Sequence, residues 1–250
     1  MNVLLLKVTL MPSVIALITL AIRKWGGKIG GLIGSMPWVA GPILFFFILE
    51  QGKPFGIYSI QGSMIGILAL ISFCVSYSAF SRRLKWFPTL LLSYSLYTLT
   101  AVVFNYLQLN LYVSYALVIV SVLLSLRFYP VPNGPPVSTR RLPFDIPIRM
   151  VVATLFVLAV TGLAGLLGPQ WSGILTPFPI MTTILAIFSH TLQGSTATIS
   201  TLRGLVIGLL GFTTFLFLQA FLLREFSVAA SFGLAFIVNV LINLISSRIW

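Results

Sequence analysis

The chain has 250 residues, of which 58% are hydrophobic and only 7% are charged, and its mean hydropathy is +1.09. Soluble domains carry about 25% charged residues, so this composition excludes a water-soluble globular domain. Three acidic residues, one histidine and one cysteine also leave little material for carboxylate-pair catalysis, a cysteine zinc site or a disulfide framework. The sequence predicts a polytopic membrane protein.

Nine apolar segments are long enough to be transmembrane helices, because about 20 apolar residues cross the hydrocarbon core of a bilayer. We expect an all-α integral membrane protein with spans at residues 3–22, 30–50, 57–80, 86–106, 109–127, 147–167, 172–193, 199–222 and 226–247. In the first segment, Lys7 interrupts the apolar run, and Arg23, Lys24 and Trp25 stand where a signal peptide has a small-residue cleavage site. The sequence therefore predicts a retained first helix.

Basic residues in alternate loops predict the orientation, because cytoplasmic loops carry an excess of Lys and Arg. With nine spans, one side of the membrane collects twelve basic residues: Arg23, Lys24, Lys28, Arg82, Arg83, Lys85, Arg127, Arg140, Arg141, Arg149, Arg203 and Arg248. The other side collects only Lys7, Lys53 and Arg224. This distribution places the N-terminus outside and the C-terminus in the cytoplasm.

The net charge of +12 could also indicate nucleic-acid binding. Here the basic residues lie in short loops beside apolar helices, where topology and anionic lipid headgroups account for them, so we expect no nucleic-acid partner. The longest loop runs from residues 130–136 on to Pro143 and Pro147, and the six of the fourteen prolines that it contains indicate a stiff, non-helical connector. This cytoplasmic loop is interpreted as a linker, with docking of a partner as the alternative.

An internal repeat appears when the chain is shifted by 142 positions. Residues 31–82 then align without a gap with residues 173–224 and share 12 identities in 52 positions. Four of the identities are glycines with a common spacing: Gly31 with Gly173, Gly52 with Gly194, Gly62 with Gly204 and Gly66 with Gly208.

The two copies are expected to face opposite sides of the membrane, because five crossings, an odd number, separate them. We therefore predict a 4+1+4 inverted repeat. Residues 1–107 form the first repeat, residues 108–146 form a linker helix with the proline-rich loop, and residues 147–250 form the second repeat. Inverted repeats are common in secondary transporters, whose sites lie at the repeat interface near the bilayer midplane. The alternative is an ancestral duplication without a present mechanism.

The second and seventh spans are expected to be broken helices, because both contain Gly and Pro at matching positions of the repeats. Each is predicted to begin extended and to become helical near Pro37 or Pro42, and near Pro177 or Pro179. Helix starts inside the membrane would point N–H groups at an anionic substrate group. The predicted binding residues here are Gly34, Ser35, Pro37, Trp38, Thr176, Pro177 and Pro179. A simple proline kink packed on glycine is the competing interpretation.

Polar residues inside membrane spans are candidates for function, because they are costly there. Glu50 and His190 precede the repeated Gln–Gly pair in opposite copies, and together with Gln51 and Gln193 they are predicted to couple transport to protons. Glu50 could instead be an interfacial carboxylate near Lys53, and His190 a packing histidine. Asn239 and Asn243, and Arg203, the repeat partner of Gln61, complete the predicted substrate-binding set. Contacts between helices for the asparagines, and a topological anchor for Arg203, are the alternatives.

Enzyme motifs are not found in the sequence. It contains no nucleophile–His–acid set, no acidic metal cluster and no phosphate-cradling Gly-Lys-Ser/Thr loop. We therefore expect neither an enzyme nor a bound metal or cofactor.

The segment from Gly31 to Pro37, with the Glu50-Gln51-Gly52 stretch after it, resembles the GlpM-type small bacterial inner-membrane proteins. These proteins carry a similar Gly-Leu-Ile-x-x-x-Pro stretch and a Glu-x-Gly further on. The resemblance covers about 25 residues in each copy and implies a duplicated, fused chain in a bacterial inner membrane. The second copy keeps Gly173, Pro179 and Gly194 but has Leu192 in place of the acid, which makes any carboxylate role rest on Glu50 alone.

Taken together, these features predict a secondary transporter or exporter of a small, anionic solute that works by alternating access of two inverted repeats. An ion channel, a lipid flippase and a non-transporting accessory subunit are the alternatives. The expected partners are the lipid bilayer and a small-molecule or ion substrate, and a homodimer is compatible with the sequence.

Overall fold

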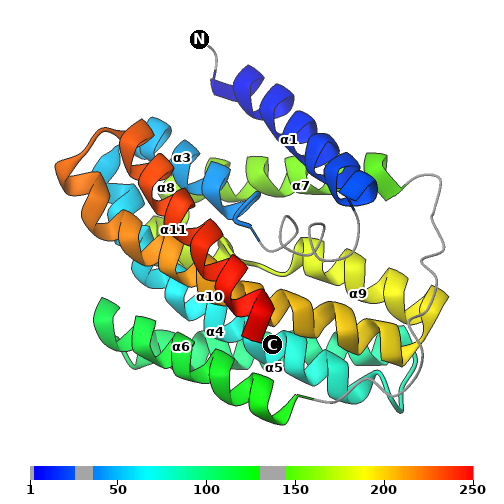
Figure 1. The fold of residues 1–250 in the computed structure, drawn as a ribbon. Helices are drawn as coiled ribbons and strands as arrows, with labels where there is room; N and C mark the ends of the chain where they lie inside the picture. Colours follow the sequence, from blue (N-terminus) through cyan, green and yellow to red (C-terminus); the bar gives the residue numbers. More distant parts are fainter. Residues whose placement is uncertain (1–2, 26–35, 130–144, 250) are drawn as a thin grey trace.

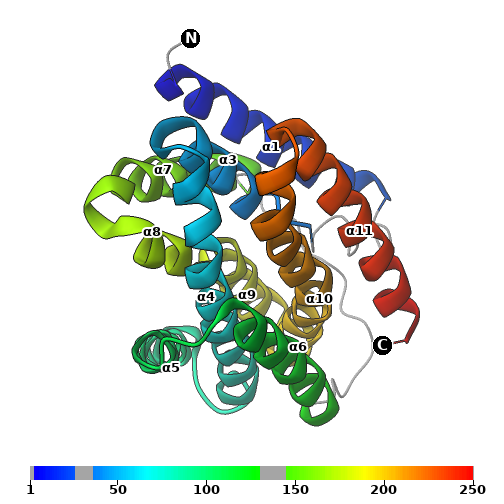
Figure 2. The same cartoon turned by 90° about the vertical axis from the view of Figure 1, so that its left-hand side faces the viewer.

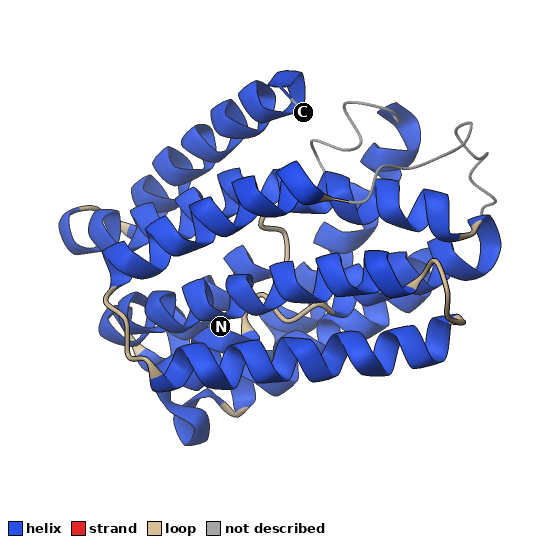
Figure 3. Cartoon of the chain, turned by 90° about the horizontal axis from the view of Figure 1, so that it is seen from below, coloured by secondary structure: helices blue, strands red, loops and turns tan. Residues whose placement is uncertain are grey.

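The computed structural model describes residues 3–25, 36–129 and 145–249. These residues form helices and no strand (Figure 3). In chain order the helices are α1 (Val3–Trp25), α3 (Ala40–Gln51), α4 (Lys53–Phe80), α5 (Trp86–Tyr106), α6 (Leu111–Phe128), α7 (Asp145–Gly162), α8 (Ala164–Leu175), α9 (Ile180–Gln193), α10 (Ser195–Glu225) and α11 (Val228–Ile249). The predicted site residues Gly34 and Ser35, and the proline-rich loop, lie outside the described residues.

Five of these helices, α4, α5, α6, α10 and α11, are long and apolar enough to cross a membrane, and the bent pair α7–α8 makes a sixth if it is counted as one span. By contrast, α3 and α9 are apolar but have only 12 and 14 residues. At 1.5 Å per residue they reach about 20 Å, which is short of the roughly 30 Å of a hydrocarbon core. The chain is thus an all-α membrane protein, while the nine-span arrangement stays a prediction.

Helices α4 and α10 run through the middle of the fold (Figures 1 and 2) and carry most of the larger apolar core. Helix α4 packs on α3, α5, α6, α8 and α10, and α10 packs on α6, α9 and α11 as well. A smaller core joins α1, α3 and α7, with Met11, Phe46 and Val157 fully buried in it. These two cores fix the positions of the short helices α3 and α9.

The contact between α4 and α8 depends on glycine. A Cβ atom at Gly62 would overlap the backbone carbonyl of Gln170, and one at Gly66 would overlap that of Ile174. On the α8 side, a Cβ at Gly173 would overlap the carbonyl of Ser59. Small residues at such spacing let helix backbones approach closely in membranes, which explains three of the glycines in the sequence repeat.

The predicted span at residues 147–167 is not one continuous helix. Helix α7 ends at Gly162, and α8 leaves it at 118°. Glycine is a poor helix former, and Gly162, Gly165 and Gly168 fall within seven residues. Gly168 has a φ of +70° just before Pro169, a position where the proline ring disfavours the α conformation.

The predicted span at residues 172–193 is also two helices, because α8 ends at Leu175 and α9 begins at Ile180. The predicted helix start beside Pro179 is confirmed, but the extended start at 172–175 is wrong, since these residues form the last turn of α8. In the first copy, α3 begins at Ala40, between Pro37 and Pro42. The residues expected to be extended before Pro37 are mostly outside the described ranges.

Matching helices of the two sequence copies begin at the repeat distance of 142 residues. This holds for α1 and α7 (3 and 145), α4 and α10 (53 and 195), and α5 and α11 (86 and 228). In Figure 1 the two members of each pair run in opposite directions, and α3 and α9 run outward from the middle to opposite ends. The short and long helices meet at Gly52 in one copy and at Gly194 in the other, with φ values of +90° and +84° that favour glycine.

Candidate functional site

The break between α8 and α9 is held by aromatic residues of α5. The ring of Phe178 stacks on Tyr94 with centroids 5.5 Å apart and meets Tyr97 edge-on at 5.2 Å. The Tyr97 hydroxyl donates to the carbonyl of Ile174 at 3.2 Å, and the Tyr94 hydroxyl bonds to Thr183 at 2.7 Å. The non-helical backbone is therefore enclosed by protein, as it must be at membrane depth.

Three predicted site residues, Thr176, Pro177 and Pro179, lie in this break and are buried. The Thr176 hydroxyl donates to the Ser172 carbonyl at 3.0 Å, which satisfies it within the last turn of α8. Pro177 faces Gly66 of α4. These residues shape the break, and Tyr94 and Tyr97 supply the polar groups that line it.

Replacing Tyr97 with phenylalanine is expected to lower the free energy of unfolding by about 1–2 kcal/mol, because the buried Ile174 carbonyl loses its donor. Tyr94→Phe is the matched control. It keeps the same ring on Phe178 but removes a bond to a hydroxyl that is only partly buried, so a smaller loss is expected. Equal losses for both variants in detergent unfolding would contradict the role assigned to Tyr97.

The start of α3 packs on α11 instead of α5. The Trp38 ring lies 5.8 Å from that of Phe236, and Pro37 is buried. The N–H of Gly41 donates to the Pro37 carbonyl at 2.8 Å, and Pro42 has no N–H. The first turn of α3 thus keeps few donors for an anion, which weakens the expectation that this helix start binds one.

Asn239 and Asn243 are buried on the face of α11 that meets α10. The Asn243 amide donates to the Asn239 side-chain oxygen at 3.4 Å and lies against Gly211. Asn239 Nδ2 and Asn243 Oδ1 have no hydrogen-bond partner within the described part of the chain. Asn239 is one turn from Phe236, whose ring meets that of Trp38.

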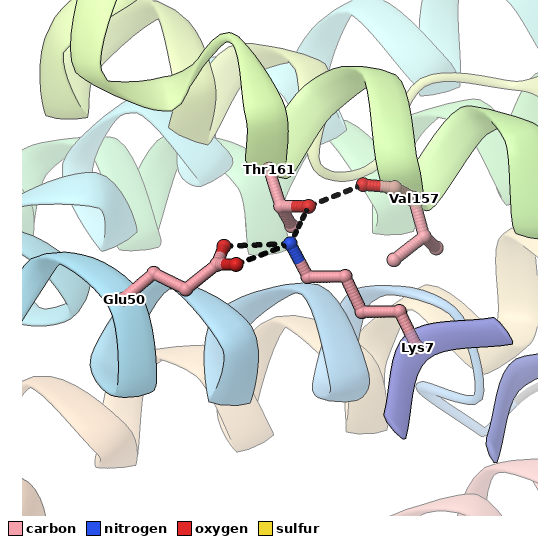
Figure 4. Close-up of polar contacts among 4 residues, drawn as sticks. All are labelled: Lys7, Glu50, Val157 and Thr161. Carbon is pink, nitrogen blue, oxygen red and sulfur yellow. Dashed lines mark hydrogen bonds and ion pairs between the residues drawn. The ribbon is translucent and has the colours of Figure 1, made fainter. Parts of the chain in front are cut away.

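Glu50 forms a partly buried ion pair that sequence reasoning missed (Figure 4). Lys7 of α1 donates to its two carboxylate oxygens at 2.7 and 2.6 Å and to the Thr161 hydroxyl of α7 at 2.6 Å. The Lys7 side chain is 4% exposed and that of Glu50 is 26% exposed. Lys7 thus lies inside α1, within the predicted first span.

Lys53, the basic residue nearest to Glu50 in sequence, donates instead to the carbonyl of Phe226 at 3.0 Å. No pattern within one segment could have shown the true partner, since Lys7 and Glu50 are 43 residues apart on separate helices. The repeat partner of Thr161 is Thr19, and each donates to the carbonyl four residues before it at 2.7 Å. The repeat partners of Lys7 and Glu50 are Arg149 and Leu192, so the second copy has no matching acid.

His190 lies in the last turn of α9, and its Nδ1 is 3.5 Å from the Tyr77 hydroxyl of α4. The two rings meet edge-on with centroids 5.8 Å apart. Because α3 and α9 run to opposite ends of the fold (Figure 1), His190 and Glu50 lie far apart. Gln51 and Gln193 are the last residues of α3 and α9, next to the glycine joints.

Arg203 and its repeat partner Gln61 both lie beside the linker helix α6. Gln61 donates to the Leu109 carbonyl at 2.5 Å and to the Ser114 hydroxyl at 2.9 Å, at the start of α6. Just past the end of α6, burial raises the pKa of Tyr129, and the nearby positive charge of Arg203 partly opposes this. A cation near a helix C-terminus is favourable, which gives Arg203 a structural role at this position.

The structure thus divides the predicted residues among separate places. Thr176, Pro177 and Pro179 share the α8–α9 break, while Trp38 and the asparagines lie around α11. Glu50 lies with Lys7 and Thr161, His190 beside Tyr77, and Arg203 near Tyr129. In the described residues, no three His, Cys, Asp or Glu side chains gather as a metal site. No family model, curated protein or solved structure matches the chain, so its function is inferred from these residues.

Proposed function

We propose that this chain is a secondary transporter of a small anionic solute. The observation that carries the proposal is the pair of half-length helices, α3 and α9, which begin after a proline in the middle of the fold and run to opposite ends (Figure 1). Broken helices at matching positions of two repeats are the usual pointer to a transporter site.

The proposal includes a 4+1+4 inverted repeat, with α6 as the linker. It is supported by the three helix pairs that start 142 residues apart and by their opposite directions. Equivalent contacts recur as well, because α4 packs on α3 and α5 as α10 packs on α9 and α11, and α6 contacts both long helices. Alternating access would be a rocking of one repeat against the other, with the solute bound between α3 and α9.

Proton coupling through Glu50 and His190 is part of the same proposal. Both are titratable, and each lies in the last turn of a half-length helix, beside a glycine joint. A group at each end of the path could take up a proton on one side and release it on the other. The bacterial inner membrane, with the N-terminus outside, is the proposed location; it follows from the loop charges and from the GlpM-type resemblance.

The test is solute uptake into proteoliposomes, measured with radiolabelled organic anions, amino acids and inorganic ions and with a pH-sensitive dye inside the vesicles. Solute-specific uptake that depends on pH and weakens in Glu50→Gln would support the proposal. Uptake that barely saturates with concentration would contradict it and favour a channel. No uptake across the panel by folded, inserted protein would contradict it in favour of lipid handling or an accessory role.

Pro37→Ala and Pro179→Ala are expected to reduce transport about tenfold or more while leaving unfolding nearly unchanged. The reason is that alanine lets the short helices extend toward their N-termini and shifts the binding groups, and small misplacements cost large factors in rate. Pro88→Ala is the matched control, because Pro88 is exposed in the first turn of the full-length α5. If transport and stability fall together in the first two variants, the prolines only kink the helices.

A further inference from the structure

We propose that Lys7 forms an entry site for the transported anion, ahead of the site between α3 and α9, and that its ligand is a small monocarboxylate, which takes the place of the Glu50 carboxylate when Glu50 is protonated. This inference rests on the proposed transport function and names its substrate class. It also sets the coupling at one proton per anion.

The ammonium group of Lys7 is held in place independently of Glu50. A lysine ammonium has three N–H donors and no acceptor, and here it faces both Glu50 oxygens and the Thr161 hydroxyl. The Thr161 hydroxyl hydrogen is used by the Val157 carbonyl at 2.7 Å. Thr161 therefore presents only lone pairs to Lys7, which keeps the charged ammonium oriented after Glu50 leaves (Figure 4).

The two charges differ in access. Lys7 is 4% exposed and lies beneath Glu50, which is 26% exposed. Lys7 is in the first turns of α1, Glu50 is next to the last residue of α3, and Thr161 is next to the last residue of α7. Three helix ends thus meet here, so the site lies at one end of the bundle, where a solute can reach the carboxylate before the ammonium.

No other described charge can replace Glu50 as the partner of Lys7. No other charged residue of the neighbouring helices lies near Lys7. On α1, Arg23 and Lys24 are at the far end, and α8 has no titratable residue. On α7, Asp145 and Arg149 lie three turns or more before Thr161 and are therefore distant from Lys7. On α4, Lys53 is engaged by the Phe226 carbonyl. Only Glu50, or an anion that takes its place, can neutralise Lys7.

Apart from its contact with Lys7, the position of Glu50 is unfavourable for a negative charge. It lies at the C-terminal end of α3, where the helix dipole disfavours negative charge. When a proton from solution binds its carboxylate, the bonds from Lys7 are released and the oxygens of the incoming anion accept them. When the anion departs, Glu50 loses the proton and pairs with Lys7 again. One proton and one anion move together, so the cycle is electroneutral.

The chemical class follows from the group that already fits. The two oxygens of the Glu50 carboxylate lie 2.7 and 2.6 Å from the Lys7 ammonium nitrogen. This nitrogen lies 5.4 Å from the centre of the Phe46 ring. Met11, Phe46 and Phe47 make the neighbouring core apolar. This surrounding suits a short carboxylate with a small apolar tail better than a phosphate or a dicarboxylate, whose second charge would have no partner.

The experiment measures binding of acetate to the purified full chain in detergent, by thermal shift, at several pH values above about 6, where acetate is ionised. Acetamide and sodium chloride serve as controls for shape and ionic strength. In the wild type we expect the affinity for acetate to rise about tenfold for each unit decrease in pH, because one proton is bound with each anion. In Glu50→Gln we expect tighter binding that does not change with pH.

Lys7→Gln combined with Glu50→Gln removes both charges together and is expected to fold but not to bind acetate at any pH. Thr161→Val should weaken binding about tenfold without changing its pH dependence, as expected for a lost hydrogen bond to a charge. Thr19→Val is the matched control, because Thr19 makes the same bond within its helix and holds no lysine in the described structure. Acetate binding that is equal in the wild type and the double variant would overturn the assignment of Lys7.

This result is separable from the fate of the proposed function. Organic-anion uptake into proteoliposomes, together with acetate binding that is independent of Lys7, would leave the transporter proposal standing and overturn the site. Acetate binding that depends on Lys7, from a protein that moves no solute, would support the site and overturn transport.

Discussion

Gly62→Ala is expected to lower the free energy of unfolding by about 3 kcal/mol, because one methyl group must push α4 and α8 apart. The new Cβ would overlap the backbone carbonyl of Gln170, and a backbone atom cannot rotate away as a side chain can. The opposing surface has no slack either, since Gly173 is packed as closely against the Ser59 carbonyl. The helix propensity gained by alanine, about 1 kcal/mol, is too small to offset this clash.

Gly204→Ala is the matched control for Gly62→Ala, since Gly204 is the repeat partner of Gly62 and lies within the equivalent helix, α10. A Cβ there meets nothing within 4 Å among the described residues. This variant should be neutral or more stable by up to about 1 kcal/mol. Unfolding in mixed micelles, followed by circular dichroism, compares the two. Similar stabilities for both variants would show that α4 and α8 are not in such close contact.

The sequence predicted the positions of most helices because long apolar runs and their glycine and proline breaks are local signals. The joint at Gly52 and Gly194 was visible as a repeated Gln–Gly pair, and both glycines have the positive φ that only glycine readily adopts. The start of α9 after Pro179 was predicted for the same reason. The bend after Gly162 was missed because the apolar run continues through it, although Gly168-Pro169 was a signal for a break.

Contacts between distant segments could not be predicted in the same way. The sequence showed that Lys7 interrupts the first apolar run but not which residue it contacts. Its partnership with Glu50 and Thr161 depends on how α1, α3 and α7 pack, and Thr161 is 154 residues away in sequence. The bond from Tyr97 to the Ile174 carbonyl likewise depends on how α5 packs against the α8–α9 break.

Glu50→Leu introduces the residue found at the matching position of the second repeat and is expected to cost about 3 kcal/mol of stability. The variant leaves the Lys7 ammonium buried with only the Thr161 hydroxyl as its partner, and an uncompensated buried charge is strongly destabilising. Glu225→Leu, at an exposed position in the last turn of α10, is the control and should change stability little.

Adding Lys7→Met to Glu50→Leu should recover most of the loss, because replacing both partners of a buried ion pair with apolar residues is often neutral or stabilising. The same mixed-micelle unfolding measures these variants together with Lys7→Met alone, which completes the double-mutant cycle and gives the coupling energy between Lys7 and Glu50. If the double variant is as stable as the wild type yet no longer binds acetate, the ion pair is not needed for folding and serves anion binding. If it stays as unstable as Glu50→Leu, the ion pair instead holds α1, α3 and α7 together.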